Sequence, residues 1–320
     1  MSEGQHEQSS LVRLSVIAPC FNEQESLAEL ERRVTPICRE QAGDSYEIIL
    51  VNDGSADGTW ELIENLADAD PHIVGIDLSR NFGHQLALTA GLSVCRGNRI
   101  LVIDADLQDP PELLGQMMAL MDEGYDVIYG QRDDRSGETW FKKASASAFY
   151  RLLSRLSSVA IPLDTGDFRL MSRRAVDTLN AMPEQHRFIR GMVSWIGYPQ
   201  RPFKYRRAER FAGVTKYPLA KMLRFALDAI TGFSIGPLRL ASWFGAVFGL
   251  LSFFALAYVL LSWLTGSTVA GWTSLMVVVL ILGSVQLLMI GIVGEYLGRL
   301  YVESKKRPLF IIKEVVSQNR

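Results

Sequence analysis

Short hydrophobic runs rich in β-branched residues alternate with amphipathic stretches over residues 14–130. The runs predict strands and the stretches predict helices. The strands are expected at residues 14–18, 47–53, 73–79, 99–104 and 126–130, and the helices at about 24–38, 59–67, 85–95 and 111–121. This order indicates an α/β fold with a mostly parallel sheet covered by helices. In such sheets ligands bind outside the carboxyl ends of the strands.

Two later segments, residues 241–264 and 273–293, contain no charged side chain. As helices they would be about 36 and 31 Å long, which is enough to cross the hydrocarbon core of a bilayer. The alternative, a pair of buried core helices, is disfavoured because neither segment has a polar face. We therefore expect two transmembrane helices joined as a hairpin.

The distribution of charge gives the expected topology. The chain has 33 Lys and Arg against 35 Asp and Glu, a net charge of −2, which disfavours a nucleic-acid partner. Residues 201–320 alone hold 15 basic and 5 acidic side chains, and the basic ones flank both hydrophobic segments. The positive-inside rule then predicts that both flanks lie in the cytoplasm, facing anionic lipid headgroups.

This topology divides the chain into three parts. Residues 1–235 form a cytoplasmic domain, residues 236–296 the hairpin and residues 297–320 a cytoplasmic tail, so that both termini are cytoplasmic. The polar, acidic start of the chain does not suggest a cleaved signal peptide. The three cysteines lie far apart, which argues against a disulfide framework and against zinc. The four histidines, including His84, are also scattered and are interpreted as surface or packing residues.

Polar segments follow four of the predicted strands. Each has an ordinary alternative explanation, such as a turn or a helix N-terminus. Four in sequence order, all on one rim of a parallel sheet, indicate a binding site. They are residues 19–23, 52–58, 79–84 and 104–111. No glycine-rich dinucleotide or P-loop motif follows any of the strands.

The segment after the fourth strand carries two carboxylates, Asp104 and Asp106, followed by Gln108. In an extended chain, side chains two apart face the same way, so Asp104 and Asp106 could reach one hard cation. Carboxylate and amide oxygens are suited to Mg²⁺ or Mn²⁺ held on a diphosphate. The sequence therefore predicts a metal that neutralises an anionic leaving group.

Five motifs together resemble a known family. They are Asp104-Ala-Asp-Leu-Gln-Asp-Pro-Pro111, Asn52-Asp-Gly-Ser55, Ser79-Arg-Asn-Phe-Gly83, Thr165-Gly-Asp-Phe-Arg-Leu-Met171 and Arg210-Phe-Ala-Gly-Val-Thr-Lys216. From about residue 14 to its end, the chain resembles the polyisoprenyl-phosphate glycosyltransferases of glycosyltransferase family 2. The pattern is nearest to the bactoprenol (undecaprenyl-phosphate) glucosyltransferase group, to which dolichol-phosphate mannose synthase is related.

The resemblance implies a GT-A nucleotide-sugar-binding domain, interfacial amphipathic helices and the C-terminal membrane hairpin. It also assigns roles to residues. The nucleotide would be held by Pro19, Phe21, Asn22, Glu23, Asp53, Arg80 and Asp104. The metal ligands would be Asp106 and Gln108, and the catalytic carboxylates Asp167, Asp104 and Asp106. The donor diphosphate or the lipid phosphate would be bound by Arg132, Arg207, Arg210 and Lys216.

The implied reaction is the inverting transfer of a hexose, glucose from UDP-glucose, to undecaprenyl phosphate at the cytoplasmic face of the bacterial inner membrane. Two alternatives remain: another sugar, such as mannose or a 4-amino-arabinose derivative, or a non-catalytic module that binds nucleotide sugars. Amphipathic stretches at residues 142–160 and 217–233 could lie on the bilayer, although the first could equally be core. The resemblance implies a homotetramer, and the β-rich tail at residues 307–316 is expected to pair with another protomer.

Asp167 resembles the family's proposed general base, but the chemistry of the acceptor favours another role. The second pKa of a phosphomonoester is about 6, so a lipid phosphate is already largely ionised at neutral pH. We expect Asp167, in a turn at residues 165–168, to orient a sugar hydroxyl or a phosphate-binding arginine. The alternative is a turn aspartate that caps the following segment.

Overall fold

The computed structural model describes residues 12–132, 165–205, 236–265 and 271–318. The chain divides into two compact units. The first contains the sheet and includes Pro308–Arg320 from the end of the chain. The second contains the two long helices of the C-terminal half.

The first unit is built on one mixed, eight-stranded sheet with the order β7-β5-β6-β4-β1-β2-β3-β8. Its central strands β4, β1, β2 and β3 are parallel, whereas β6 runs antiparallel to both β4 and β5, and β8 runs antiparallel to β3. The strands are β1 (Leu14–Cys20), β2 (Tyr46–Asn52), β3 (Ile73–Leu78), β4 (Arg99–Val102), β5 (Val127–Arg132), β6 (Thr165–Ser172), β7 (Gln200–Tyr205) and β8 (Ile312–Val316).

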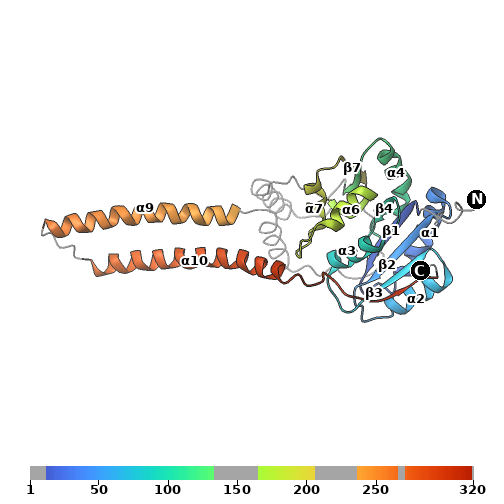
Figure 1. The fold of residues 1–320 in the computed structure, drawn as a ribbon, viewed down its shortest axis with the longest axis horizontal. Coiled ribbons are helices and arrows are strands. Elements are labelled where there is room, and N and C mark those ends of the chain that lie inside the picture. Colours follow the sequence, from blue (N-terminus) through green and yellow to red (C-terminus); the bar gives the residue numbers. More distant parts are fainter. Residues whose placement is uncertain (1–11, 133–164, 206–235, 266–270, 319–320) are drawn as a thin grey trace, which may run out of the picture. The chain divides into compact units, whose positions relative to one another are not determined.

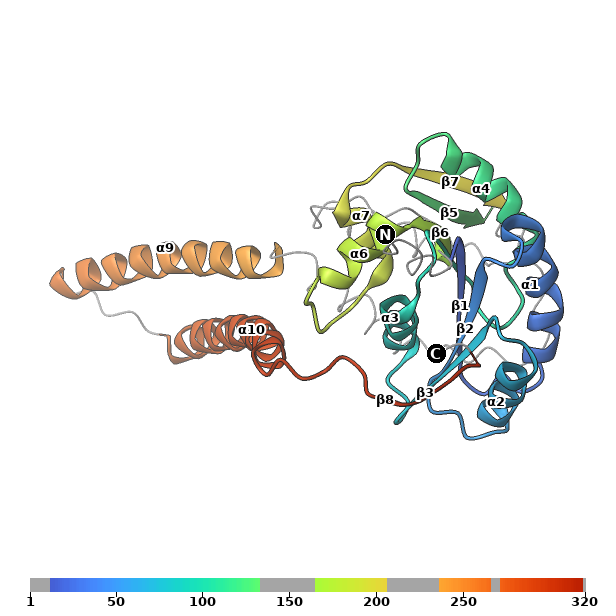
Figure 2. The same cartoon turned by 45° about the vertical axis from the view of Figure 1, so that its right-hand side comes forward.

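Helices cover both faces of the sheet (Figures 1 and 2). One face carries α1 (Leu27–Ala42), α2 (Thr59–Ala69) and α4 (Leu114–Asp122), the last preceded by a 3₁₀ turn at Pro111–Leu113. The other carries α3 (His84–Val94), α6 (Arg173–Ala181) and α7 (Ile189–Ile196). The α/β architecture expected from the sequence is confirmed.

Strand β1 shows why its sequence is nearly all hydrophobic, with Ser15 as the polar exception. All seven of its residues are buried. Leu14, Val16 and Ala18 belong to the core cluster that α1 also joins, and Ile17 faces α3. A Cβ on Gly91 of α3 would lie 2.4 Å from Ile17 Cγ2, so the glycine allows this close packing. A strand buried on both faces has no polar side to alternate.

All five predicted strands and all four predicted helices are present, but one predicted turn is wrong. Residues 165–168, expected to form a turn around Asp167, belong to strand β6. This strand lies between β4 and β5, with Val102 opposite Arg169 and Val127 opposite Met171. A Thr-Gly-Asp sequence is typical of a turn, and only pairing with strands far away in the chain makes it extended.

The expectation that the tail pairs with another protomer is also wrong for this structure. Strand β8 pairs with β3 of its own chain, with Ile76 opposite Val315. Val316 packs against the core cluster. A Cβ on Gly75 of β3 would lie 2.6 Å from Val316 Cγ2, so the glycine leaves space for the valine.

The second unit holds helices α9 (Gly236–Leu264) and α10 (Trp272–Ser304). Helix α10 extends beyond the predicted span, which ended at residue 293, and includes the Glu295–Arg299 ion pair. Among the described residues, one stretch, Ile281–Ser304, is long and apolar enough to cross a membrane by length and composition. Many of its large apolar side chains are exposed, for example Leu287 to 72% and Leu288 to 60%. Such a surface is suited to lipid rather than water.

Candidate active site

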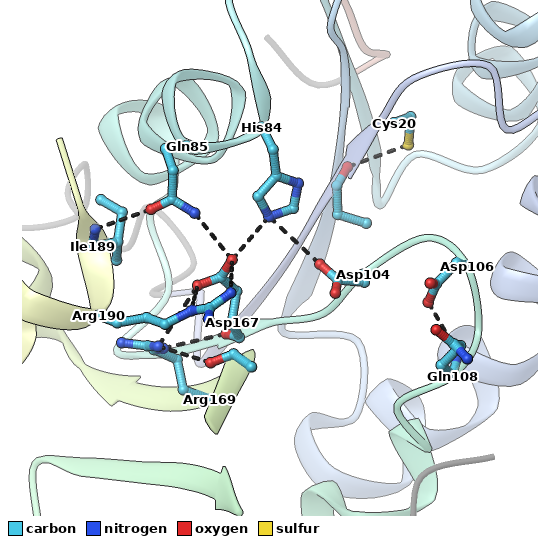
Figure 3. Close-up of polar contacts among 12 residues, drawn as sticks. Cys20, His84, Gln85, Asp104, Asp106, Gln108, Asp167, Arg169, Ile189 and Arg190 are labelled. Carbon is cyan, nitrogen blue, oxygen red and sulfur yellow. Dashed lines mark hydrogen bonds and ion pairs between the residues drawn. The ribbon is translucent and has the colours of Figure 1, made fainter. Parts of the chain in front are cut away.

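The centre of the candidate site is an ion pair between Asp167 of β6 and Arg190 of α7 (Figure 3). Arg190 Nε donates to Asp167 Oδ1 at 2.9 Å, and the terminal nitrogen Nη2 donates to Oδ2 at 3.2 Å. The Asp167 side chain is 3% exposed, whereas that of Arg190 is 29% exposed. The buried carboxylate therefore holds a guanidinium that reaches the surface of the domain.

The first residues of α3 also bind Asp167. His84 Nε2 lies 3.1 Å and Gln85 Nε2 lies 3.0 Å from Asp167 Oδ2. The side-chain oxygen of Gln85 accepts a hydrogen bond of 3.0 Å from the backbone N–H of Ile189. Gln85 thus links Asp167 to the start of α7, the helix that carries Arg190.

A second arginine, Arg169, lies buried beside the same carboxylate. Its Nε donates to the carbonyl oxygen of Asp167 at 3.2 Å, and its Nη2 donates to that of Gly166 at 3.0 Å. Its Nη2 is also 3.7 Å from Asp167 Oδ1. Burial lowers the pKa of Arg169 to about 10, so it remains charged at neutral pH.

These cations determine the ionisation of Asp167. Burial alone would raise its pKa, but the charge of Arg190 and the hydrogen bonds from His84 and Arg190 hold it well below its usual value. Desolvation would lower the pKa of His84, yet the hydrogen bond to Asp167 and the charge of Asp104 raise it to about 8. Asp167 is consequently an anion at neutral pH and a poor proton acceptor.

Asp104 lies next to this cluster. Its Oδ1 is 3.6 Å from His84 Nε2 and, within the part of the chain that is described, accepts no hydrogen bond. Desolvation raises the pKa of Asp104 to about 6. A buried carboxylate oxygen without a donor is suited to a cation or to a ligand hydroxyl.

The reasoning that placed Asp104 and Asp106 on one face of a strand is wrong. Strand β4 ends at Val102, and the chain then turns, with Leu107 at φ +59°. Figure 3 shows Asp104 pointing toward His84, whereas Asp106 lies beside Gln108, whose backbone N–H donates to Asp106 Oδ1 at 3.1 Å. No cluster of three His, Cys, Asp or Glu side chains arranged to hold a metal ion occurs among the described residues.

The loops after β1 and β2 hold each other through Asn22. Its backbone N–H donates to Ser55 Oγ at 3.0 Å, and its side-chain oxygen accepts from the backbone of Ala56 at 2.9 Å. Asn22 has φ +57°, a conformation that asparagine tolerates better than most residues. Beside it, Phe21 is 48% exposed, and the backbone of Glu23 donates to Thr59 Oγ1 at 2.9 Å.

The side chain of Asp53 binds the backbone of the loop after β3. Its two carboxylate oxygens accept from the backbone N–H groups of Phe82 at 2.7 Å and Gly83 at 2.9 Å. Burial raises the pKa of Asp53, and these two hydrogen bonds oppose the rise. In the same loop the Arg80 guanidinium lies 4.0 Å from the centre of the Phe82 ring. Asp53 therefore organises the loop that carries Arg80 and leads into His84.

The sequence matches known proteins over most of the chain. The family described as Glycosyl transferase family 2 matches residues 15–179, and the family described as GtrB C-terminal hairpin matches residues 236–300. The chain belongs to glycosyl transferase family 2. It is therefore a glycosyltransferase, and the expected family is confirmed. The hairpin match and the apolar α10 together indicate a protein associated with a membrane.

Individual relatives are similar along nearly their entire length. The chain is 46% identical to the uncharacterized glycosyltransferase YkcC of Bacillus subtilis, over 95% of this chain and 94% of that protein. It is 40% identical to the bactoprenol glucosyl transferase of Shigella phage SfV, over 94% and 98%. Glucosyl-3-phosphoglycerate synthase of Mycobacterium tuberculosis is a similar solved structure, with 18% identity, a TM-score of 0.44 and coverage of 68% and 77%.

In this family 2 protein, the predicted site residues that the structure describes lie at the expected rim of the sheet. Pro19 lies near the end of β1, followed by Phe21, Asn22 and Glu23, and Asp53 follows β2. Arg132 is the last residue of β5, opposite Tyr205 of β7. Three predicted phosphate-binding residues and both amphipathic stretches lie outside the described residues: Arg207, Arg210, Lys216, and residues 142–160 and 217–233.

Sequence reasoning missed three residues of the site. His84 was interpreted as a surface or packing residue, but it contacts Asp167 and Asp104. Its position directly after the Ser79–Gly83 motif was the signal that could have indicated it. Gln85 and Arg190 carried no comparable signal, because only the fold brings the starts of α3 and α7 to the same strand.

Proposed function

We propose that the protein transfers glucose from UDP-glucose to undecaprenyl phosphate, with inversion at the sugar, giving a lipid-phosphate-linked glucose. The supporting observation is the full-length similarity to a bactoprenol glucosyl transferase, which includes both the family 2 region and the hairpin. The names of such relatives favour glucose over mannose or a 4-amino-arabinose derivative. The presence of a hairpin in the same chain fits an acceptor that resides in the membrane.

The donor nucleotide is assigned to the loops after β1, β2 and β3. Phe21 offers an exposed aromatic ring for the base, and Pro19, Asn22 and Glu23 shape its surroundings. Both oxygens of Asp53 bind backbone groups of the Arg80 loop, so we assign Asp53 to positioning this loop. Asp104, with a buried oxygen that accepts no hydrogen bond among the described residues, is assigned to the sugar or the diphosphate.

A divalent cation, Mg²⁺ or Mn²⁺, is assigned to Asp106 and Gln108. Their oxygen donors suit a hard cation that takes its remaining ligands from water and phosphate. When bound, such an ion supplies positive charge to the diphosphate leaving group. The protein's own contribution is to hold the Asp106 carboxylate, which the backbone of Gln108 does at 3.1 Å.

The acceptor phosphate is assigned to arginines and lysines, with Asp167 as a positioning residue. For Arg190 the described residues show how the side chain is positioned, because it donates two hydrogen bonds to Asp167. Arg132, Arg207, Arg210 and Lys216 are proposed to share the phosphates of donor and acceptor. Positive side chains offset the repulsion between two anionic substrates and align them for direct displacement.

We propose a multi-pass protein of the bacterial inner membrane, with residues 1–235 and 297–320 in the cytoplasm. A cysteine introduced at Ser267 should then react with an impermeant thiol reagent added from outside, whereas Ser317→Cys should not. The opposite labelling would contradict this orientation. We also propose a homotetramer, and a monomer in mild detergent, measured by light scattering, would contradict it.

The function is tested by incubating the purified full-length protein with undecaprenyl phosphate and a panel of labelled nucleotide sugars. Glucose from UDP-glucose should enter the lipid fraction, and transfer should stop in Asp106→Ala. Preferential transfer of another sugar would contradict the glucose assignment. Absence of transfer from every donor would contradict the proposed reaction.

A further inference from the structure

The C-terminal strand β8 lies outside both regions that match known families, which end at residues 179 and 300. It nevertheless forms the edge of the sheet beside β3, as Figure 2 shows. Backbone pairing runs from Gly75 opposite Val316 to Leu78 opposite Ile312. The last described residues of the chain are therefore an integral part of the sheet that carries the candidate donor site.

One side chain of β8 reaches a buried carboxylate of β3. The pairing register shifts between Asp77 and Leu78, which leaves Lys313 as an extra residue between Ile312 and Glu314. Such irregularities redirect a side chain. Lys313 Nζ lies 2.8 Å from Asp77 Oδ2. The Asp77 side chain is 5% exposed, and a carboxylate this deeply buried requires a cation or hydrogen-bond donors.

The other oxygen of Asp77 connects to the candidate donor site. Asn52 Nδ2 donates to Asp77 Oδ1 at 2.7 Å. The side-chain oxygen of Asn52 accepts from the backbone N–H of Ser55 at 3.2 Å. Ser55 Oγ in turn accepts from the backbone N–H of Asn22 at 3.0 Å. A continuous series of four polar contacts thus runs from Lys313 to Asn22.

The middle of this series is shielded from water, because Asn52 is 3% and Asp77 is 4% exposed. Asn52 and Asp77 are also cross-strand neighbours in the register of β2 and β3. Without Lys313, the buried carboxylate of Asp77 must be stabilised by Asn52 or by water. Either change alters how Asn52 holds the loop that begins at Ser55.

We propose that Lys313 is a positioning residue of the donor site, and that strand β8 completes this site from the far end of the chain. Lys313 neutralises Asp77, Asp77 orients Asn52, and Asn52 holds the loops at residues 22–23 and 52–58 in the conformation that binds the nucleotide. This inference rests on the proposed function, which assigns the nucleotide to those loops.

The test uses the full-length protein in detergent, with UDP as the probe in calorimetry and UDP-glucose in steady-state kinetics. Lys313→Met removes the charge and keeps the aliphatic stem. Because Lys313 is largely exposed, we expect a moderate effect, a rise of about three- to fivefold in the Kd for UDP and in the donor KM. The value of kcat and the acceptor KM should stay within about twofold, since the contacts of Asp167 are unchanged.

Matched variants separate positioning from general stability. Lys313→Arg keeps the charge and should restore the affinity for UDP, and Glu314→Gln, which alters the neighbouring charge of the same strand, should behave as wild type. Asp77→Asn should weaken UDP binding, and combining it with Lys313→Met should add little further loss.

Three results would overturn the inference. One is an unchanged affinity for UDP in Lys313→Met, and another is a loss of kcat and of thermal stability with an unchanged donor KM. The third is full additivity of the Lys313→Met and Asp77→Asn effects. These outcomes differ from failure of the proposed function, in which the wild-type protein itself would not bind UDP.

Discussion

Asp167 and Arg190 form a two-point ion pair in which the carboxylate is buried and the guanidinium reaches the surface of the domain. Asp167 also accepts a hydrogen bond from Gln85 at the start of α3 and lies beside Arg169. A carboxylate with these neighbours has its pKa held well below the usual value by Arg190 and His84, against the effect of burial. We therefore expect Asp167 to act by holding Arg190 rather than by accepting a proton.

The first prediction concerns the geometry of Arg190. Arg190→Lys keeps the charge but cannot make two parallel hydrogen bonds to Asp167. We expect kcat/KM for the lipid acceptor to fall by about a hundredfold, because a displaced phosphate ligand misaligns the reactants. Arg174→Lys is the matched control, since Arg174 also binds both oxygens of an aspartate, Asp126. Equal losses in the two variants would contradict a special role for Arg190.

The second prediction concerns His84 and pH. Its pKa in the folded protein is raised to about 8 from an ordinary 6.5, so its contribution to stability is complete below pH 6.5 and is lost as pH rises through 8. Because the His84 side chain is partly exposed, solvent screening reduces this contribution to about 1 kcal/mol. In thermal unfolding with EDTA present, the melting temperatures of wild type and His84→Gln should therefore differ more at pH 6 than at pH 9. A difference independent of pH, or equal to that of His186→Gln, would contradict the prediction.

The third prediction concerns Gly54, which has φ +65°. A Cβ at this position would lie 2.5 Å from the backbone of both Arg80 and Asn81. Gly54→Ala should push the two donor loops apart, weakening UDP binding and destabilising the fold by about 2–4 kcal/mol. Gly43 provides the control, because it has φ +61° and a Cβ added there would meet no atom within 4 Å. Gly43→Ala should reduce stability and leave UDP binding intact; equal effects on UDP binding would refute the role of close approach.

The fourth prediction concerns the cation. Asp106→Ala, or removal of divalent ions with EDTA, should reduce turnover by at least about a thousandfold, because the diphosphate leaving group is no longer neutralised. The melting temperature without metal should stay close to that of wild type. Asp122→Ala, at an exposed surface ion pair with Arg99, is the control and should remain active. Full activity of the wild type in EDTA would contradict the metal assignment.

The parts of the fold that the sequence predicted are those set by local pattern. Strand β1 is nearly all hydrophobic because both of its faces are buried, and α1 shows a clear apolar stripe at Leu27, Leu30 and Val34. Strand β6 was missed because Thr-Gly-Asp is a turn sequence, and its extended form depends on β4 and β5. The pairing of β8 with β3 was likewise missed, because strands far apart in the chain form it and no local pattern records the space that Gly75 leaves for Val316.

The same division applies to the site. The polar ends of β1, β2 and β3 could be predicted to meet, because parallel strands bring their carboxyl ends to one edge. Arg190 could not be predicted to belong to the site, since it reaches Asp167 only through the placement of α7. Gln85 fixes this placement by binding the backbone of Ile189. A single histidine such as His84 also has no recognisable spacing, although it lies next to a motif of the family.

The pH profile of Asp167→Asn distinguishes a carboxylate that positions Arg190 from a general base. Loss of the buried charge should cost about 3–5 kcal/mol of stability, so rates are measured where the variant is folded. The ratio of wild-type to variant activity is determined in a His84→Gln background, so that titration of His84 does not enter it. If Asp167 positions Arg190, this ratio stays nearly constant from about pH 6.5 to 9, where the acceptor phosphate is mostly ionised. A defect that shrinks steeply as pH rises would contradict this account and establish Asp167 as the general base.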